Sequence, residues 1–233
     1  CCYPDTALLN QSSFDWSASD LADPEVVQIQ KYIKDDIEVG LNKIAQSNED
    51  IASDIFDALV KAKPNARKEI ALFTLQRSEK KLLMQALAII KELEDLDDFV
   101  TILHKKISSE HAEVRISSME LLAATKDIKL FKLLFQKAQK ESFSLKEAEV
   151  IGNVLYRINP SVCFQDMYDW IKPQGLFSFK KISTSKQQKW VAIAALALID
   201  KPEIEKTLQK LKKTASEDIS QACTKALYRR KKH

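Results

Sequence analysis

The sequence predicts an all-α protein in which antiparallel helix hairpins stack into a right-handed superhelix. Three observations support this fold class. Glycine is scarce, with three residues among 233, against a usual share of about 7%. Long stretches are rich in the helix formers Ala, Leu, Lys and Glu. Apolar residues recur at three- and four-residue spacing, and no segment shows the sustained alternation of a strand.

The N-terminal region divides into an arm and two cap helices. Residues 1–22 are rich in Ser and Asp and lack sustained periodicity, so we expect a flexible arm. Asp23 and Pro24 then supply a helix N-cap and a proline at the first helical position. We predict cap helices within 25–62, at the start of one repeat domain that extends over 23–233.

About five helix pairs are predicted over 65–231. Several of their starts carry capping chemistry: Ser144 with Glu147 forms a capping-box pattern, and Pro160 and Pro202 restart the chain after short breaks. Together with the cap helices, the predicted ranges are 25–46, 50–62, 65–76, 79–93, 96–107, 111–124, 127–140, 145–158, 160–172, 185–199, 202–214 and 217–231. Twelve short helices with tight connections indicate an antiparallel array rather than a bundle of a few long helices.

The second helices of successive pairs share an internal pattern. It consists of a bulky residue, a small residue four positions later and a leucine-like residue after four more. The pattern occurs at Val114, Ser118 and Leu122, at Ile219, Cys223 and Leu227, at Trp190, Ala194 and Leu198, and more loosely at Leu82, Ala86 and Ile90 and at Glu147, Ile151 and Leu155. The starting positions are separated by 32, 33, 43 and 29 residues, a spacing typical of helical repeats with one insertion.

One segment resembles a known repeat signature. SSEHAEVRISSMELLAATKD is similar to the HEAT repeat, in which an acidic residue and Val-Arg open the second helix. The matching residues are Glu113, Val114 and Arg115. Asp218 and Ile219 repeat the pattern, but Ser220 stands where Arg is expected. The resemblance covers about 65–231 and implies a HEAT- or ARM-like solenoid, while it implies little about activity.

Charge is distributed unevenly along the chain. Residues 1–60 carry twelve acidic and three basic side chains, whereas residues 170–233 carry fifteen basic and five acidic ones. Such a gradient can orient partners or neighbouring copies, although a solvated surface alone would also produce it. A basic C-terminal half keeps nucleic-acid binding open as an alternative function.

No motif for catalysis is present. The chain has no Gly-rich phosphate loop, no CxxC, no HExxH and no GxSxG. We therefore expect no catalytic residue, no metal and no cofactor, and a non-enzymatic protein–protein interaction scaffold. HEAT-like hydroxylases carry His-Glu dipeptides, which this chain lacks. HEAT-like DNA glycosylases are a less favoured alternative, which Trp170 and Trp190 with nearby lysines, and Asp169 next to Trp170, only faintly match.

The predicted partner-binding site is an insertion at 172–186, KPQGLFSFKKISTSK. It interrupts the repeat and places aromatic residues beside lysines, and insertions in solenoids often lie on the binding face. The predicted site residues are Trp170, Leu176, Phe177, Phe179, Lys180, Lys181 and Lys189. The alternative is that the phenylalanines cover an exposed repeat edge. We expect an unidentified protein partner with an acidic or mixed surface; the acidic segment of a second copy would give head-to-tail association.

Cysteine usage and hydropathy bear on location. Cys163 and Cys223 fall at apolar helical positions, where a thiol packs as a small hydrophobe. No apolar run approaches the length of a membrane span. We expect a cytoplasmic protein, although the chain begins at Cys1 rather than Met and an upstream anchor or signal therefore stays open.

Overall fold

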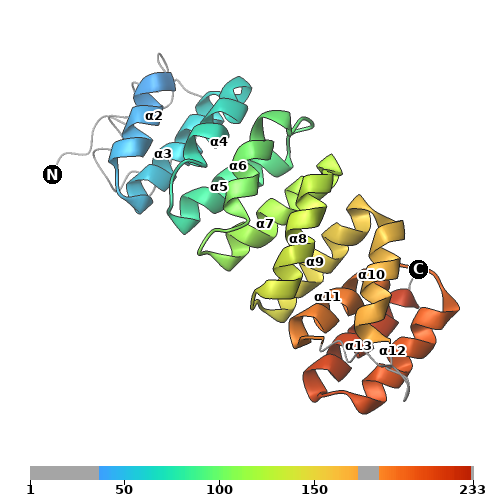
Figure 1. Ribbon diagram of the computed structural model, residues 1–233. Coiled ribbons are helices and arrows are strands. Elements are labelled where there is room, and N and C mark those ends of the chain that lie inside the picture. The colour runs from blue at the N-terminus through green and yellow to red at the C-terminus, as the bar shows by residue number, and fades with distance from the viewer. Residues whose placement is uncertain (1–36, 173–183, 232–233) are drawn as a thin grey trace. The chain divides into compact units, whose positions relative to one another are not determined.

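The structure is a computed structural model that describes residues 37–172 and 184–231. The predicted arm at 1–22 and the start of the first predicted helix lie outside the described residues. Every regular element between residue 37 and residue 231, outside the gap at 173–183, is helical (Figure 1). The prediction of an all-α protein is confirmed.

The chain forms two compact units, Cys1–Lys105 and Lys106–His233. The helices of the first unit are α2 (Ile37–Gln46), α3 (Glu49–Ala62), α4 (Arg67–Thr74), α5 (Lys80–Lys91) and α6 (Val100–Lys106), with single 3₁₀ turns at Pro64–Ala66 and Asp97–Phe99. Consecutive helices pair, α2 with α3 and α4 with α5. Corresponding helices of the two pairs are also in contact: α2 contacts α4, and α3 contacts α5.

Arg77 holds the end of α2 in the first unit. Its guanidinium donates hydrogen bonds to the carbonyl oxygens of Ile44, Ala45 and Ser47, which satisfies acceptors that a helix C-terminus leaves unpaired. Glu79 pairs with the same guanidinium, and the hydrogen bond from Arg77 lowers the pKa of Glu79 to about 2. One arginine thus joins the turn before α5 to the end of a helix about 30 residues earlier.

The second unit contains seven helices among its described residues. They are α7 (Ala112–Leu122), α8 (Ile128–Lys140), α9 (Leu145–Ile158), α10 (Pro160–Ile171), α11 (Lys186–Leu196), α12 (Pro202–Thr214) and α13 (Glu217–Arg230), with a 3₁₀ turn at Ala123–Thr125 after α7. Contacts join α8 to α9, α10 to α11 and α12 to α13. A second series of contacts links α7, α9, α11 and α13 in succession (Figure 1). Alternate helices of this unit therefore lie side by side.

Helix α11 is the centre of the second unit. Residues 191–197, VAIAALA, are all buried, as expected for a helix that is apolar on all sides. Its approach to α9 is close at Gly152. A Cβ built on Gly152 would lie 2.5 Å from the carbonyl oxygen of Val191, 2.9 Å from the Cβ of Ala194 and 2.9 Å from the nitrogen of Ala195. Glycine is the residue that allows the two backbones this proximity.

The predicted helix starts in this unit are confirmed. Ser144 accepts a hydrogen bond from the backbone of Glu147, and the Glu147 carboxylate accepts one from the backbone of Ser144, which completes the capping box. Asn159 caps α10, whose first residue is Pro160, and Pro202 begins α12.

The repeated pattern falls on the expected helices. Four copies lie on α5, α7, α9 and α13, and the fifth begins on α11 and ends at Leu198, two residues past that helix. The middle residue of each copy is buried. These middle residues are Ala86, Ser118, Ile151, Ala194 and Cys223. The pattern therefore marks a buried position on every second helix, where a side chain faces neighbouring elements.

Candidate functional site

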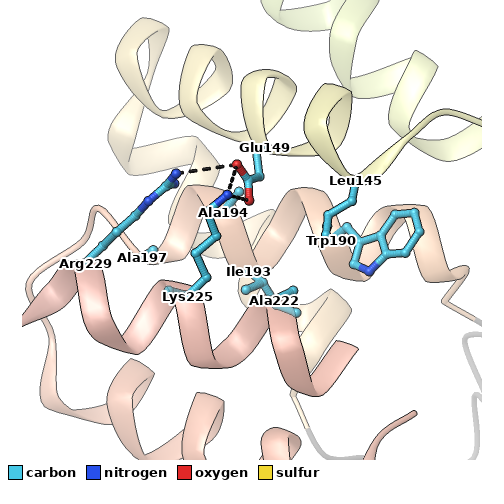
Figure 2. Close-up of a pocket in the computed structure, with 10 residues that line it drawn as sticks. Leu145, Glu149, Trp190, Ile193, Ala194, Ala197, Ala222, Lys225 and Arg229 are labelled. Carbon is cyan, nitrogen blue, oxygen red and sulfur yellow. Dashed lines mark hydrogen bonds and ion pairs between the residues drawn. The ribbon is translucent and has the colours of Figure 1, made fainter. Parts of the chain in front are cut away.

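A shallow groove lies over α9, α11 and α13 in the second unit (Figure 2). We call it the Trp190 groove. It is lined by Leu145 and Glu149 from α9, by Trp190, Ile193, Ala194 and Ala197 from α11, and by Ala222, Lys225, Ala226 and Arg229 from α13. Four of the lining residues are alanines, and each of them is at most 7% exposed.

The charged part of the groove has two cations and one carboxylate. Lys225 Nζ lies 2.6 Å and 2.8 Å from the two carboxylate oxygens of Glu149, and Arg229 Nη2 lies 3.4 Å from Oε2. Figure 2 shows both side chains extending from α13 toward Glu149. The Glu149 side chain is 16% exposed, whereas Lys225 is 53% and Arg229 is 36% exposed. The cluster therefore carries one uncompensated positive charge that faces solvent.

Trp190 lies at the other end of the groove from Arg229 (Figure 2). Lys186 Nζ lies 4.6 Å from the centre of the indole ring, within the range of a cation–π contact. Lys186 also pairs with Asp218, and its hydrogen bond, with that of Ser216, lowers the pKa of Asp218 to about 2. The Nε1–H of Trp190 is buried and finds no acceptor within the described part of the chain. Buried indoles usually have one.

A buried ion pair connects the neighbouring helices α7 and α9. Arg115 Nε lies 2.7 Å from Glu147 Oε1, and the Glu147 side chain is only 3% exposed. Burial alone would raise the pKa of Glu147, but hydrogen bonds from Arg115 and Ser144 outweigh burial and hold the pKa below its ordinary value. Arg115 also donates to the carbonyl oxygens of Ser109 and Glu110. This arginine of the resemblance therefore has a structural role.

The size of the Trp190 groove indicates which ligands it accepts. A volume of about 10 Å³ is open to the centre of a water molecule, which is close to the room that one water requires. Such a groove does not enclose a metabolite, and a partner would contact it at its edge, through Trp190, Lys225 and Arg229. Within the described ranges, no three His, Cys, Asp or Glu side chains are grouped so that they could hold a metal ion.

The predicted site is only partly covered by the structure. Leu176, Phe177, Phe179, Lys180 and Lys181 lie outside the described residues. The remaining two predicted residues are placed on separate helices.

Trp170 is in the last turn of α10, and its ring stacks on Phe135 of α8 with 5.1 Å between ring centres. Lys189 is half-buried in the first turn of α11. Among the aromatic contacts of the described residues, the partner of the Trp170 ring is Phe135, whereas the lysine over Trp190 is Lys186.

Sequence reasoning did not assign the Trp190 groove as a site. Trp190 was assigned to the repeat pattern as its bulky residue. The signal that could have identified it is the residue type: the same position holds Val, Ile, Leu or Glu in the other copies. A half-buried tryptophan with a polar N–H to satisfy is typical of an interface.

The two described thiols are structural. Cys163 and Cys223 are both buried and unpaired. Burial raises the pKa of Cys163 to about 12 and that of Cys223 to about 11, so neither forms the reactive thiolate at neutral pH. The predicted packing role of both cysteines is confirmed.

Comparison with known proteins does not assign the chain to a family. No protein-family model matches it, and neither a curated protein nor a solved structure matches it significantly. Of the helices that the structure describes, none has the length and apolar composition that crossing a bilayer requires.

Proposed function

We propose that this protein is a non-enzymatic protein–protein interaction scaffold built on HEAT-like repeats, and that the Trp190 groove is a binding face. The succession of contacts along α7, α9, α11 and α13 supports a solenoid, because stacked repeats place equivalent helices next to one another. The burial of the repeated pattern on alternate helices supports the same arrangement. Solenoids expose extended surfaces that bind other macromolecules.

The observation that carries the proposal is the composition of the groove. A soluble helix face that faces only water is usually rich in charged and polar residues. Here the half-buried Trp190 lies next to buried alanines of α11 and α13 and is bordered by cations that exceed the local carboxylates. An apolar centre with an aromatic residue and a charged rim is the arrangement of a protein interface.

Site-specific photo-crosslinking in cells of the native organism tests this function. A benzoylphenylalanine replaces Gln221, one turn before Lys225 on α13, and in a matched control it replaces Gln209 on α12. Both glutamines are exposed, and each contacts a glutamate one turn earlier. We expect one protein adduct from position 221 and none from position 209. No adduct, or equal adducts from both positions, would contradict the proposal.

Nucleic-acid binding is a second candidate, favoured by one observation. Helix α12 carries the exposed lysines Lys206, Lys210, Lys212 and Lys213, which could contact phosphates. Contacts of this kind release counterions, so affinity must fall steeply with salt, and removal of one contacting lysine should reduce the salt slope by about one. Fluorescence titration of a 20-nucleotide duplex at low salt measures this, and absence of binding there removes the candidate.

A further inference from the structure

The chemistry of the Trp190 groove specifies a class of partner. We infer that the groove binds an acidic segment of a partner protein, in which a carboxylate pairs with Lys225 and Arg229 while an apolar side chain of the same segment packs on the half-buried ring of Trp190. This inference rests on the proposed scaffold function and adds the chemistry of the partner.

The first step in the argument is the excess of positive charge. Lys225 and Arg229 both contact Glu149, and among the described residues Glu149 is the only acidic one that lines the groove. One carboxylate cannot compensate two cations, and more than a third of each cationic side chain is exposed. An incoming carboxylate would therefore meet an attractive field at a place where no desolvation of a deeply buried charge is needed.

The second step is the apolar surface beside these charges. Ala194, Ala197, Ala222 and Ala226 are between 4% and 7% exposed, and they line the groove next to Ile193 and Trp190. The four alanines and Ile193 are therefore buried, and the half-buried ring of Trp190 is the apolar group that a partner side chain can reach. An apolar residue near the carboxylate would add this contact, which a plain acidic tract would not supply.

The third step concerns Glu149 itself. Because Glu149 already pairs with both cations, a partner carboxylate must compete with Glu149 for them. Neutralising Glu149 should consequently strengthen binding, whereas reversing the charge of Lys225 should weaken it. If the ion pair were purely structural, both substitutions would weaken partner binding. Stronger binding by Glu149→Gln together with weaker binding by Lys225→Glu therefore distinguishes a binding role from a structural one.

The experiment uses the full chain and a random library of displayed 12-residue peptides. Peptides selected on the immobilised protein are synthesised, and their affinities are measured by fluorescence polarisation at 150 mM salt. We expect selected peptides to be enriched in Asp or Glu beside Leu, Phe or Trp. Lys225→Glu should weaken their binding about tenfold or more, and Glu149→Gln should strengthen it about threefold, as expected for gain or loss of one exposed charge contact in a partly desolvated site.

Lys210→Glu on α12 is the matched control, since Lys210 is exposed and does not line the groove. It makes the same charge change, and its binding should stay within about twofold of the parent, as for a distant exposed charge that salt screens. Arg229→Gln is a second variant, to be used if Lys225→Glu lowers the thermal stability.

Three results would overturn the inference: selected peptides without acidic enrichment, weaker binding by both Lys225→Glu and Glu149→Gln, or selective binding of a thymidine 20-mer in place of the peptides. If crosslinking from position 221 captures a protein while the acidic preference is absent, the scaffold function stands and this inference alone fails.

Discussion

Replacing Gly152 by alanine tests the closest helix approach in the second unit. In an ordinary helix interior this change stabilises by about 0.8–1.0 kcal/mol, because alanine has the higher helix propensity. Here the new Cβ would lie 2.5 Å from the carbonyl oxygen of Val191 and 2.9 Å from the nitrogen of Ala195. Both are backbone atoms, so neither can move aside by a change of rotamer.

The magnitude follows from the displacement that these contacts demand. Contacts of a Cβ below 3.0 Å are essentially never observed, so α9 and α11 must separate by at least 0.5 Å. A gap of 0.5–1 Å forfeits a quarter to a half of the dispersion attraction across the contact, and overpacking of cores typically costs about 1–3 kcal/mol. Because the clashes involve backbone atoms of α11, we take the upper end of this range, about 3 kcal/mol; after subtraction of the propensity gain of about 1 kcal/mol, we expect Gly152→Ala to destabilise by about 2 kcal/mol.

Urea denaturation followed by circular dichroism at 222 nm measures this difference. With an m-value of about 2 kcal/mol per molar urea, the midpoint should fall by about 1 M. Ala88→Gly on the exposed side of α5 is the control, and it should destabilise by about 1 kcal/mol through propensity alone. If Gly152→Ala raised the midpoint instead, the close approach of α9 and α11 would be wrong.

The other predictions concern the ion pair, the packing and the thiols. Arg115→Ala should destabilise by about 2–3 kcal/mol at pH 7, because it leaves the buried Glu147 carboxylate without its cation. Since the folded-state pKa of Glu147 lies below its ordinary 4.5, this loss should shrink as the pH falls below about 4.5, and a pH-independent loss would contradict the assignment. Ala194→Trp should lower the thermal midpoint, since overpacking at this buried residue costs about 1–3 kcal/mol or more; an unchanged midpoint would refute this. Iodoacetamide should modify neither Cys163 nor Cys223 in the native protein, which peptide mapping by mass spectrometry checks against a urea-unfolded control.

The helices could be predicted because they depend on local chemistry. Contacts between residues distant in the sequence could not be predicted. Ser144 with Glu147 and the proline at 160 act within one turn of chain, so their pattern in the sequence is also their mechanism in the structure. Periodicity identified buried positions such as Ala194 for the same reason.

The candidate site depends on long-range neighbours, which periodicity does not specify. Glu149 and Lys225 are 76 residues apart, and no local rule selects Lys225 among the many lysines of the C-terminal half. Glu147 illustrates the same limit. Its capping role was readable from the residues around it, but its burial against Arg115, 32 residues earlier, required the packing of α9 on α7.

Arginine contacts to carbonyl oxygens have a consequence for the order in which the chain can complete its structure during synthesis. Like Arg77, Arg230 donates to carbonyl oxygens at the end of a helix, here those of Leu196 in α11 and of Ile199 and Lys201 after it. The donor of the Ile199 contact is made 31 residues after its acceptor. Backbone N–H groups of Ile199, Lys201 and Ile204 already donate to the same three oxygens, so Arg230 adds a second donor to an end that has formed locally. This contact between the end of α11 and α13 can form only after all of α12 and α13 have been synthesised.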